Sequence, residues 1–187
     1  MMNVTSGATE RLPSGLFPKI SNYRRKVFVE KLGWDLQVKS GGEQDQFDRS
    51  DTVYVVAQDT HGHIVGCARL LPTNRPYLMG EVFPQLLNGL PPPCSPDIWE
   101  LSRFAAVDLN NPSAERGQLS SPIAVDLLQE SIECAAAHGA KRLITVSPIG
   151  IERLLRKAGF HAHRAGPPMI IGGHPIFACW IEVEAAV

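Results

Sequence analysis

The chain has 187 residues, of which 44% are hydrophobic and 20% are charged, and its formal net charge is −1. This composition is typical of a globular protein and excludes a largely disordered chain. The near-zero net charge argues against a protein that binds nucleic acid through bulk electrostatics, since such proteins carry a basic surplus.

The first quarter of the chain predicts a tail, a helix and a loop. Residues 1–15 are polar and lack the basic start and apolar stretch of a signal peptide, so we expect a loose N-terminal tail and a cytoplasmic protein. Apolar residues then recur at near-helical spacing from Leu16 to Leu32, and Gly33 can end this helix. Residues 35–50 are polar and contain glycine, which indicates a loop.

A hairpin, a short helix and a strand are expected next. Residues 52–57 (TVYVVA) and 64–71 (IVGCARLL) have the composition of strands, and the turn sequence DTHGH at 59–63 separates them. Residues 81–87 favour a short helix. Residues 98–107 (IWELSRFAAV) predict a further strand.

The second half alternates helix and strand. Helices are expected over 121–138 and 151–158, and strands over 143–146 and 176–183. No run approaches the ~18 apolar residues that cross a bilayer, so we expect no membrane insertion. We predict a single domain over residues 1–187 with an α/β (α+β) sandwich fold, in which helices cover a mixed, mostly antiparallel sheet.

Charged residues stand where an apolar core is expected. Arg69 lies inside the apolar strand sequence VGCARLL, and Glu100 and Arg103 lie inside IWELSRFAAV. Any one of them alone is more commonly a solvated surface charge. Together they need partners, because an unpaired buried charge costs several kcal/mol. Three arginines balance three carboxylates, and we predict one cluster of Arg24, Asp45, Asp48, Arg69, Glu100 and Arg103.

The spacing of these residues resembles that of a known family. The pattern is Arg24-x3-Phe28-x5-Trp34, then Asp45-Gln-Phe-Asp48, then Cys-Ala-Arg69-Leu-Leu-Pro, then Glu100-Leu-Ser-Arg103-Phe104. It is similar to the autoinducer synthases, the acyl-homoserine-lactone synthases, from about Tyr23 to Asp108. The resemblance implies a three-layer, N-acetyltransferase-like sandwich in which two splayed central strands receive a pantetheine arm. The chain lacks the glycine-rich pyrophosphate loop of acetyl-CoA users, as that family does, which agrees with an acyl carrier protein as donor.

The resemblance implies that S-adenosylmethionine is a substrate, with no cofactor required. Arginines suit its carboxylate through forked hydrogen bonds, and carboxylates suit its amine and sulfonium. Aromatic faces suit the sulfonium or the adenine, although plain core packing also accounts for Phe28 and Trp34. The implied binding residues are Arg24, Phe28, Trp34, Asp45, Asp48 and Arg69, and the implied catalytic residues are Glu100 and Arg103.

The implied reaction is acyl transfer followed by lactone formation. The amine attacks the thioester, and the carboxylate then closes the ring and expels methylthioadenosine. An α-amine has a pKa near ~8, so a carboxylate base suffices and no nucleophilic serine or cysteine is needed; Glu100 is the candidate. Residues three apart on a regular strand point to opposite faces. If Glu100 and Arg103 share a site, an irregularity near Leu101–Ser102 is required.

The second half is expected to bind the acyl chain and its carrier. Phe104 and Thr145 are implied for the acyl pocket, although Thr145 is equally explained as an ordinary strand threonine. The last helix carries a basic stretch that is commonly a solvated face. Because carrier proteins are acidic, we predict docking on Arg153, Arg156 and Lys157, with Lys141 and Arg142 nearby.

Other functions have weaker support. The pairs His61-x-His63 and His161-x-His163 lack the ligand spacing of a zinc site, so we expect no metal. The four cysteines form no CxxC pair, which indicates small buried hydrophobes. Two alternatives stay open: an N-acyltransferase of similar fold that uses acyl-CoA on another amine, and a non-catalytic sensor of an acyl ligand. Acyl-chain length, oxidation at the third carbon and oligomeric state are not predicted.

Overall fold

The computed structural model describes residues 2–111 and 121–183. Contacts between residues divide the chain into two compact units. Unit 1 consists of Met1–Arg69 and Arg103–Glu130, and unit 2 consists of Leu70–Ser102 and Ser131–Val187. The single domain expected from the sequence stays a prediction.

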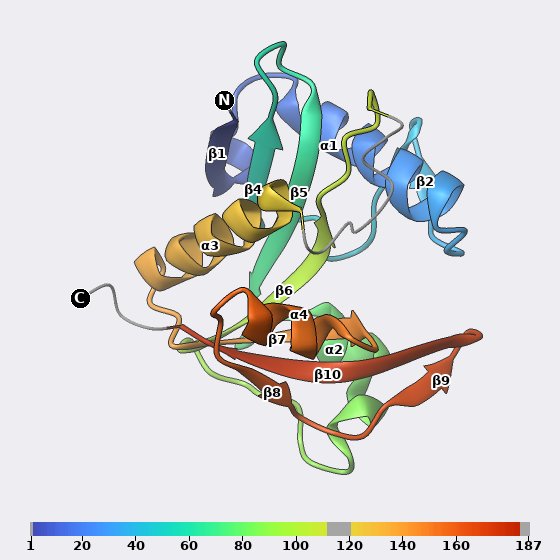
Figure 1. The fold of residues 1–187 in the computed structure, drawn as a ribbon, viewed down its shortest axis with the longest axis vertical. Helices are drawn as coiled ribbons and strands as arrows, with labels where there is room; N and C mark the ends of the chain where they lie inside the picture. The colour runs from blue at the N-terminus through green and yellow to red at the C-terminus, as the bar shows by residue number, and fades with distance from the viewer. Residues whose placement is uncertain (1, 112–120, 184–187) are drawn as a thin grey trace. The chain divides into compact units, whose positions relative to one another are not determined.

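The elements follow the order expected from the sequence, with short strands added (Figure 1). The strands are β1 (Asn3–Ala8), β2 (Val38–Lys39), β3 (Gly42–Glu43), β4 (Val53–Gln58), β5 (Ile64–Pro72), β6 (Ile98–Ala105), β7 (Arg142–Pro148), β8 (Ala162–Arg164), β9 (Met169–Ile171) and β10 (His174–Glu182). The helices are η1 (Thr9–Arg11), α1 (Leu16–Arg24), η2 (Arg25–Lys31), α2 (Leu78–Val82), η3 (Pro84–Leu87), α3 (Pro122–Ala137) and α4 (Ile151–Lys157). Eight strands form a sheet in the order β1-β4-β5-β6-β7-β10-β8, with β9 paired to β10. The predicted mixed sheet with flanking helices is confirmed.

Strand β1 corrects the loose tail expected over residues 1–15. It pairs antiparallel with β4 from Asn3↔Gln58 to Ala8↔Val53 (Figure 1). An unpaired β4 edge would leave a row of backbone groups without partners, and β1 satisfies them. The residues of β1 are mostly polar and small, so they carry no apolar alternation from which a strand could be predicted.

The first predicted helix has two parts. The α-helix α1 passes into the π-helical η2, where the Leu32 N–H donates to the Val27 carbonyl at 3.0 Å. Gly33 follows with φ +69°, as expected of a helix end. Ile20 and Val27 are fully buried in the core of unit 1. The buried side of this helix also carries Arg24.

A tight hairpin of β2 and β3 lies against α1. Its two turn residues, Ser40 and Gly41, have φ of 49° and 80°, which is the type I′ geometry of two-residue hairpins. A Cβ atom on Gly42 would lie 2.2 Å from the Ser21 hydroxyl oxygen, so only glycine allows this approach. The hairpin thereby brings Glu43 beside the end of α1.

Strand β6 is irregular close to the position that was predicted from the sequence. It pairs with β7 in parallel from Ile98↔Arg142 to Glu100↔Ile144. Arg103 then has φ +50°, a left-handed conformation that is rare for arginine. The irregularity lies one residue beyond the predicted Leu101–Ser102 position. A left-handed residue inside a strand redirects its side chain, which costs about 1–3 kcal/mol and must be offset by contacts.

In unit 2, β10 is the strand around which the others assemble. It pairs antiparallel with β7, β8 and β9, and α4 lies beside β8 (Figure 1). Leu143, Ile144, Phe177 and Ala178 are completely buried and form part of its core. The two strands that the sequence did not predict, β8 and β9, have three residues each, which is too short for a periodic pattern.

Candidate functional site

Six charged side chains of unit 1 form a closed ring in which arginines and carboxylates alternate. Arg24 donates to Glu43 Oε2 at 2.6 Å and binds both oxygens of Asp48 at 2.7 and 3.1 Å. Arg69 binds Asp48 at 3.1 Å and both oxygens of Asp45 at 2.7 and 3.1 Å. Arg103 closes the ring with Asp45 at 3.0 Å and Glu43 at 3.1 and 3.2 Å. Charge is balanced within the ring.

The ring is buried, and its most exposed members are Asp45 and Arg103. The side chains of Arg24, Arg69 and Glu43 have no exposed surface. Arg103 is 6% exposed and Asp45 is 13% exposed. These two members are bonded to each other, so the Asp45–Arg103 pair is the most exposed part of the ring.

Burial and mutual attraction oppose each other in the ring. Burial alone would raise the pKa of Asp48, but the charges of Arg24 and Arg69 hold it well below its usual range. Burial likewise favours neutral Arg24, and Asp48 and Glu43 nevertheless raise its pKa. Asp48 and Arg24 are therefore charged at neutral pH.

Tyr54 on β4 forms a hydrogen bond to a member of the ring. Its hydroxyl donates to Asp48 Oδ1, and burial together with the Asp48 charge raises the pKa of Tyr54 well above its usual value. The tyrosine is thus neutral and acts as a donor. Asp48 also accepts the Asp45 backbone N–H at 2.8 Å. This bond fixes the positions of the two aspartates of the loop relative to each other.

Aromatic rings line the same region. Phe28 and Trp34 stack with centroids 5.1 Å apart and planes 20° from parallel. The Arg103 guanidinium lies over Phe28 at 5.9 Å, and that of Arg69 lies over Phe47 at 5.8 Å. Phe28 is buried, whereas Trp34 is partly exposed. Five of the six predicted cluster members and both predicted aromatics therefore come together in unit 1.

Glu100, the sixth predicted member, belongs to unit 2. Its carboxylate accepts the backbone N–H groups of Leu78 at 3.0 Å and Met79 at 2.6 Å, at the first turn of α2. A carboxylate suits the N-terminus of a helix because the free N–H groups there carry partial positive charge. Within the ring, Glu43 occupies the place that the sequence analysis assigned to Glu100.

The predicted acyl-pocket residues lie in different units. Thr145 on β7 is buried and stands opposite Cys179 of β10. Phe104 on β6 follows Arg103 in unit 1 and is partly buried. Because the two residues belong to different units, their assignment to one acyl pocket stays a prediction.

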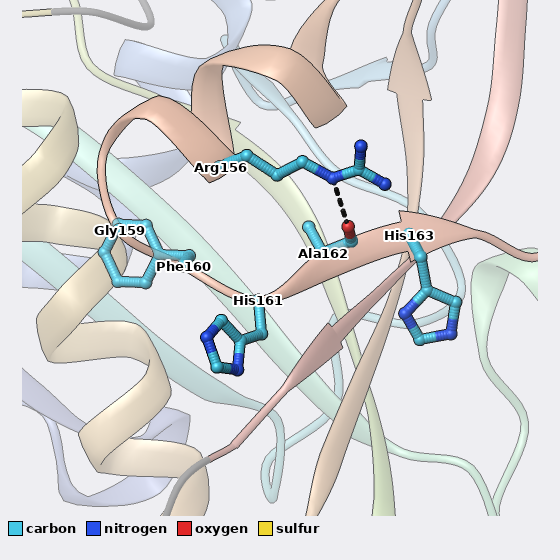
Figure 2. Close-up of a pocket in the computed structure, with 6 residues that line it drawn as sticks. All are labelled: Arg156, Gly159, Phe160, His161, Ala162 and His163. Atoms are coloured by element: carbon cyan, nitrogen blue, oxygen red, sulfur yellow. Dashed lines mark hydrogen bonds between the residues drawn. The ribbon is translucent and has the colours of Figure 1, made fainter.

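The predicted docking residues lie on α4, beside a groove of about 410 Å³ (Figure 2). Arg156 lines this groove with Phe160, His161 and His163. Its Nε donates to the Ala162 carbonyl at 2.9 Å, and its Nη2 binds Glu152 at 2.7 Å. Arg153 and Lys157 are exposed. This part of unit 2 thus presents a fixed cation beside a hollow surface.

Other candidate chemistry is weak among residues 2–111 and 121–183. No three metal-ligating side chains gather there, and no helix in those ranges has the length and apolarity to cross a bilayer. Burial raises the pKa of the Cys67 thiol to about 12 and that of Cys179 to about 12, so both are neutral at pH 7. A thiolate nucleophile at either position is disfavoured.

The sequence analysis missed two members of the site. Glu43 precedes Asp45 in the segment EQDQFD, and a third carboxylate in the same loop was a signal that it belongs with the other two. Tyr54 lies in the buried strand TVYVVA, where a hydroxyl needs a partner. Neither signal names the partner, which comes from another element.

Comparison with known proteins shows one consistent likeness. The profile of the autoinducer synthase family matches residues 11–187. An acyl-homoserine-lactone synthase from Acinetobacter nosocomialis is 60% identical over 183 residues, which cover 97% of this chain and 100% of that protein. Both matches span nearly the whole chain, including all six ring residues.

Solved structures of similar proteins have the same fold. TofI, solved in a ternary complex with an inhibitor and MTA, is 44% identical in sequence and has a TM-score of 0.84. The match covers 98% of this chain and 92% of the TofI chain. BjaI, a CoA-dependent acyl-homoserine-lactone synthase with SAM and isopentyl-CoA, is 26% identical with a TM-score of 0.83 and covers 98% and 83%. Relatives with this fold therefore include one described as CoA-dependent.

Proposed function

The chain belongs to the autoinducer synthase family and is an acyl-homoserine-lactone synthase, and from this premise we propose that its charge ring binds S-adenosylmethionine and that an acyl carrier protein supplies the acyl group. The observation that carries the proposal is the closed ring of three arginines and three carboxylates. Such a ring offers donors and acceptors of both charges within a small space. A simple acyl-ligand pocket would need few of them.

The ring matches the charges of S-adenosylmethionine. Arg103 and Asp45, the most exposed members of the ring, are proposed to bind a zwitterionic amino acid, because the guanidinium suits its carboxylate and the aspartate suits its amine. Arg24 and Arg69, which are fully buried, hold Asp48 and Asp45 in position. Phe28 and Trp34 supply aromatic faces for the sulfonium or the adenine.

The reaction then needs little from the protein beyond positioning and a base. The substrate amine attacks the thioester carbonyl, a C–N bond forms, and the carrier thiol leaves. The substrate carboxylate oxygen then attacks the carbon bonded to the sulfonium, and that C–S bond breaks to release methylthioadenosine. Freeing an α-amine at pH 7 costs about 1–1.5 kcal/mol. Glu100, held in a fixed orientation by two backbone N–H groups, is the proposed base or amine anchor.

Carrier protein, rather than coenzyme A, is the proposed donor because of the cationic surface on α4. Arg153, Arg156 and Lys157 are exposed there, and Arg156 is held rigid by Ala162 and Glu152. An acidic carrier would be steered to such a surface. Action in the cytoplasm stays a prediction from the sequence.

One assay tests the reaction and the donor together. Purified protein is supplied with S-adenosylmethionine and either an acyl carrier protein or acyl-CoA, and lactone, methylthioadenosine and free thiol are measured by mass spectrometry. We expect equimolar release of all three with the carrier and a far higher KM with acyl-CoA. Thiol release without methylthioadenosine would indicate acyl transfer to another amine, and binding without either product would indicate a sensor.

Two isosteric variants separate the proposed roles of the glutamates. Glu43→Gln removes a charge that Arg24 and Arg103 share, so KM for S-adenosylmethionine should rise. Glu100→Gln should instead lower kcat by about 100-fold or more if Glu100 is the base. Glu130→Gln, an exposed helical carboxylate in unit 1, is the control. Equal kcat in the Glu100 variant and the wild type would remove Glu100 from the chemistry.

Charge reversal tests the docking surface. Arg153→Glu combined with Arg156→Glu should raise KM for the acyl carrier protein about tenfold, and added salt should have the same effect on the wild type. Lys19→Glu makes the same change of charge at an exposed position of α1 and should leave this KM unaltered. A carrier KM that responds to neither charge reversal nor salt would exclude electrostatic docking on α4.

A further inference from the structure

An exposed apolar row spans β9, β10 and the turn that follows β7 in unit 2. Pro175 of β10 stands opposite Ile170 of β9, and its carbonyl accepts the Ile149 N–H just beyond β7. Residues directly opposite each other on paired strands share a face of the sheet. Ile170 is 78% exposed and Ile149 is 54% exposed, and Pro175 between them is also exposed. We name this set, Ile149, Pro175 and Ile170, the apolar row.

The hairpin that carries the row is held by its turn. Gly172 and Gly173 connect β9 to β10 with φ of 58° and 81°, the type I′ geometry that matches the twist of the strands. Two of the three members, Ile170 and Pro175, therefore lie on paired strands, and Ile149 lies in the turn that follows β7. Contiguous apolar surface exposed in this way marks an interaction site more often than isolated apolar residues do.

The apolar row and the cationic helix α4 lie on the same face of the sheet. Alternate residues of β10 point to one side, so Pro175 shares its face with Phe177 and Cys179. Arg164 stands opposite Cys179, lies over the Phe177 ring at 5.3 Å, and binds Glu152 of α4 at 2.9 Å. Helix α4 therefore covers the sheet face that carries Phe177 and Cys179. The apolar row lies on the same face, beyond the end of β7.

The charged residues around the apolar row indicate what charge a partner would carry. From Ile149 to Ile176 the chain has a single carboxylate, Glu152, and this is paired with Arg156 and Arg164. The same segment has four arginine or lysine residues, in a protein whose total charge is −1. A partner that fits this face has acidic side chains beside exposed apolar ones.

We propose that the apolar row is the second half of the carrier-docking surface, on which an acidic acyl carrier protein places an apolar side-chain patch while its carboxylates face α4. This inference rests on the proposed carrier donor and adds the contact that discriminates between partners. Charge alone steers an acidic protein to α4 and changes the association rate. A buried apolar contact slows dissociation and distinguishes the carrier from other acidic proteins.

The test is the KM for acyl carrier protein, measured at saturating S-adenosylmethionine, in variants of Ile170. Ile170→Glu should raise this KM about tenfold and Ile170→Ser about threefold, because the first adds repulsion to the lost apolar contact. The KM for S-adenosylmethionine should stay within twofold of the wild type. Leu90→Glu, at an apolar position of unit 2 that is 65% exposed, is the matched control and should change neither constant.

The outcomes separate this inference from the proposed donor. If the wild type uses the carrier and the Arg153/Arg156 reversal weakens it, but Ile170→Glu does not, the carrier proposal stands and the row plays no part. If the wild type makes lactone from acyl-CoA and none from the carrier, the donor proposal itself fails. If Ile170→Glu instead abolishes a dimer seen by light scattering, with the carrier KM unchanged, the row binds a second copy of this chain and the inference is overturned.

Discussion

The two units of the protein use charge in opposite ways. In unit 1, six charged side chains are brought into the interior, where Arg24, Arg69 and Glu43 have no exposed surface. In unit 2, the ion pairs lie on the surface: Lys141 pairs with Asp97 while 75% of the lysine side chain is exposed. Buried pairs are screened little by salt and lose much when broken, whereas exposed pairs are worth little.

The difference agrees with the roles proposed for the two units. A buried, closed ring is rigid and holds donors and acceptors in fixed positions, which suits recognition of a small zwitterion. The cations on α4 are exposed to solvent and accessible to a partner, which suits steering of a protein. Removal of single groups from each unit tests this contrast.

The largest effect is expected from Arg24→Met. The variant leaves Asp48 and Glu43 buried with one fewer cation, so the free energy of unfolding should fall by about 3–5 kcal/mol, with loss of synthase activity. Urea unfolding followed by circular dichroism measures this. Arg25→Met, at the next residue, removes a partly exposed pair with Glu30 and should cost less than about 1 kcal/mol. Equal losses in the two variants would contradict the distinction between buried and exposed charge.

A smaller, pH-dependent effect is expected from Asp48→Asn, since Glu43 and Asp45 still neutralise the arginines. The folded-state pKa of Asp48 lies below its unfolded value of 3.8. Its contribution to stability is therefore present above that pH and is lost as the pH falls through the folded-state pKa. The variant should be less stable than the wild type at pH 7, and the difference should narrow below a pH of about 4. A difference that is constant from pH 7 to pH 3 would show that Asp48 is not held ionised by the ring.

Tyr54→Phe should have a lesser effect of the same kind. The Tyr54 hydroxyl donates to Asp48 and helps to lower the pKa of that carboxyl. Without it, stability should fall by about 1–3 kcal/mol, and the acid unfolding midpoint should move to higher pH. Tyr77→Phe removes a hydroxyl that donates to the uncharged Pro93 carbonyl and is the control for the midpoint. An unchanged midpoint in the Tyr54 variant would separate the tyrosine from the ring.

The smallest effect is expected in unit 2 from Lys141→Ala. Its pair with Asp97 is largely exposed to solvent, so unfolding in urea should be unchanged and insensitive to added salt. Measurement at low and high ionic strength checks both statements. A clear loss of stability at low salt would show that the surface charges of unit 2 contribute to folding, beyond the docking proposed for them.

Much of the fold could be predicted from local pattern. Strand β4 and helix α4 appear within a residue or two of their expected bounds, because apolar periodicity specifies such elements directly. Strand β1 could not be predicted, since its polar residues form a strand only by pairing with β4. The type of β4 and α4 followed from their own residues, whereas β1 is a strand only because it pairs with β4.

The site was likewise only partly predictable from the sequence. That Arg69 and Arg103 need partners followed from charges inside apolar strands, and the structure places them among carboxylates as expected. Which carboxylate completes the set did not follow. Glu100 is near Arg103 in sequence, yet Glu43, sixty residues away, is the one that bonds it.

From the sequence alone it follows that this protein buries opposed charges, belongs with the autoinducer synthases and folds as a mixed sheet with helices. How the charges close into a ring, and which apolar side chains remain exposed beside α4, depends on the tertiary structure. This is because the need for a partner is a property of one residue and its immediate neighbours. The identity of that partner depends on the hairpin against α1, the left-handed backbone at Arg103 and the register of β10, each of which is set by contacts between distant segments.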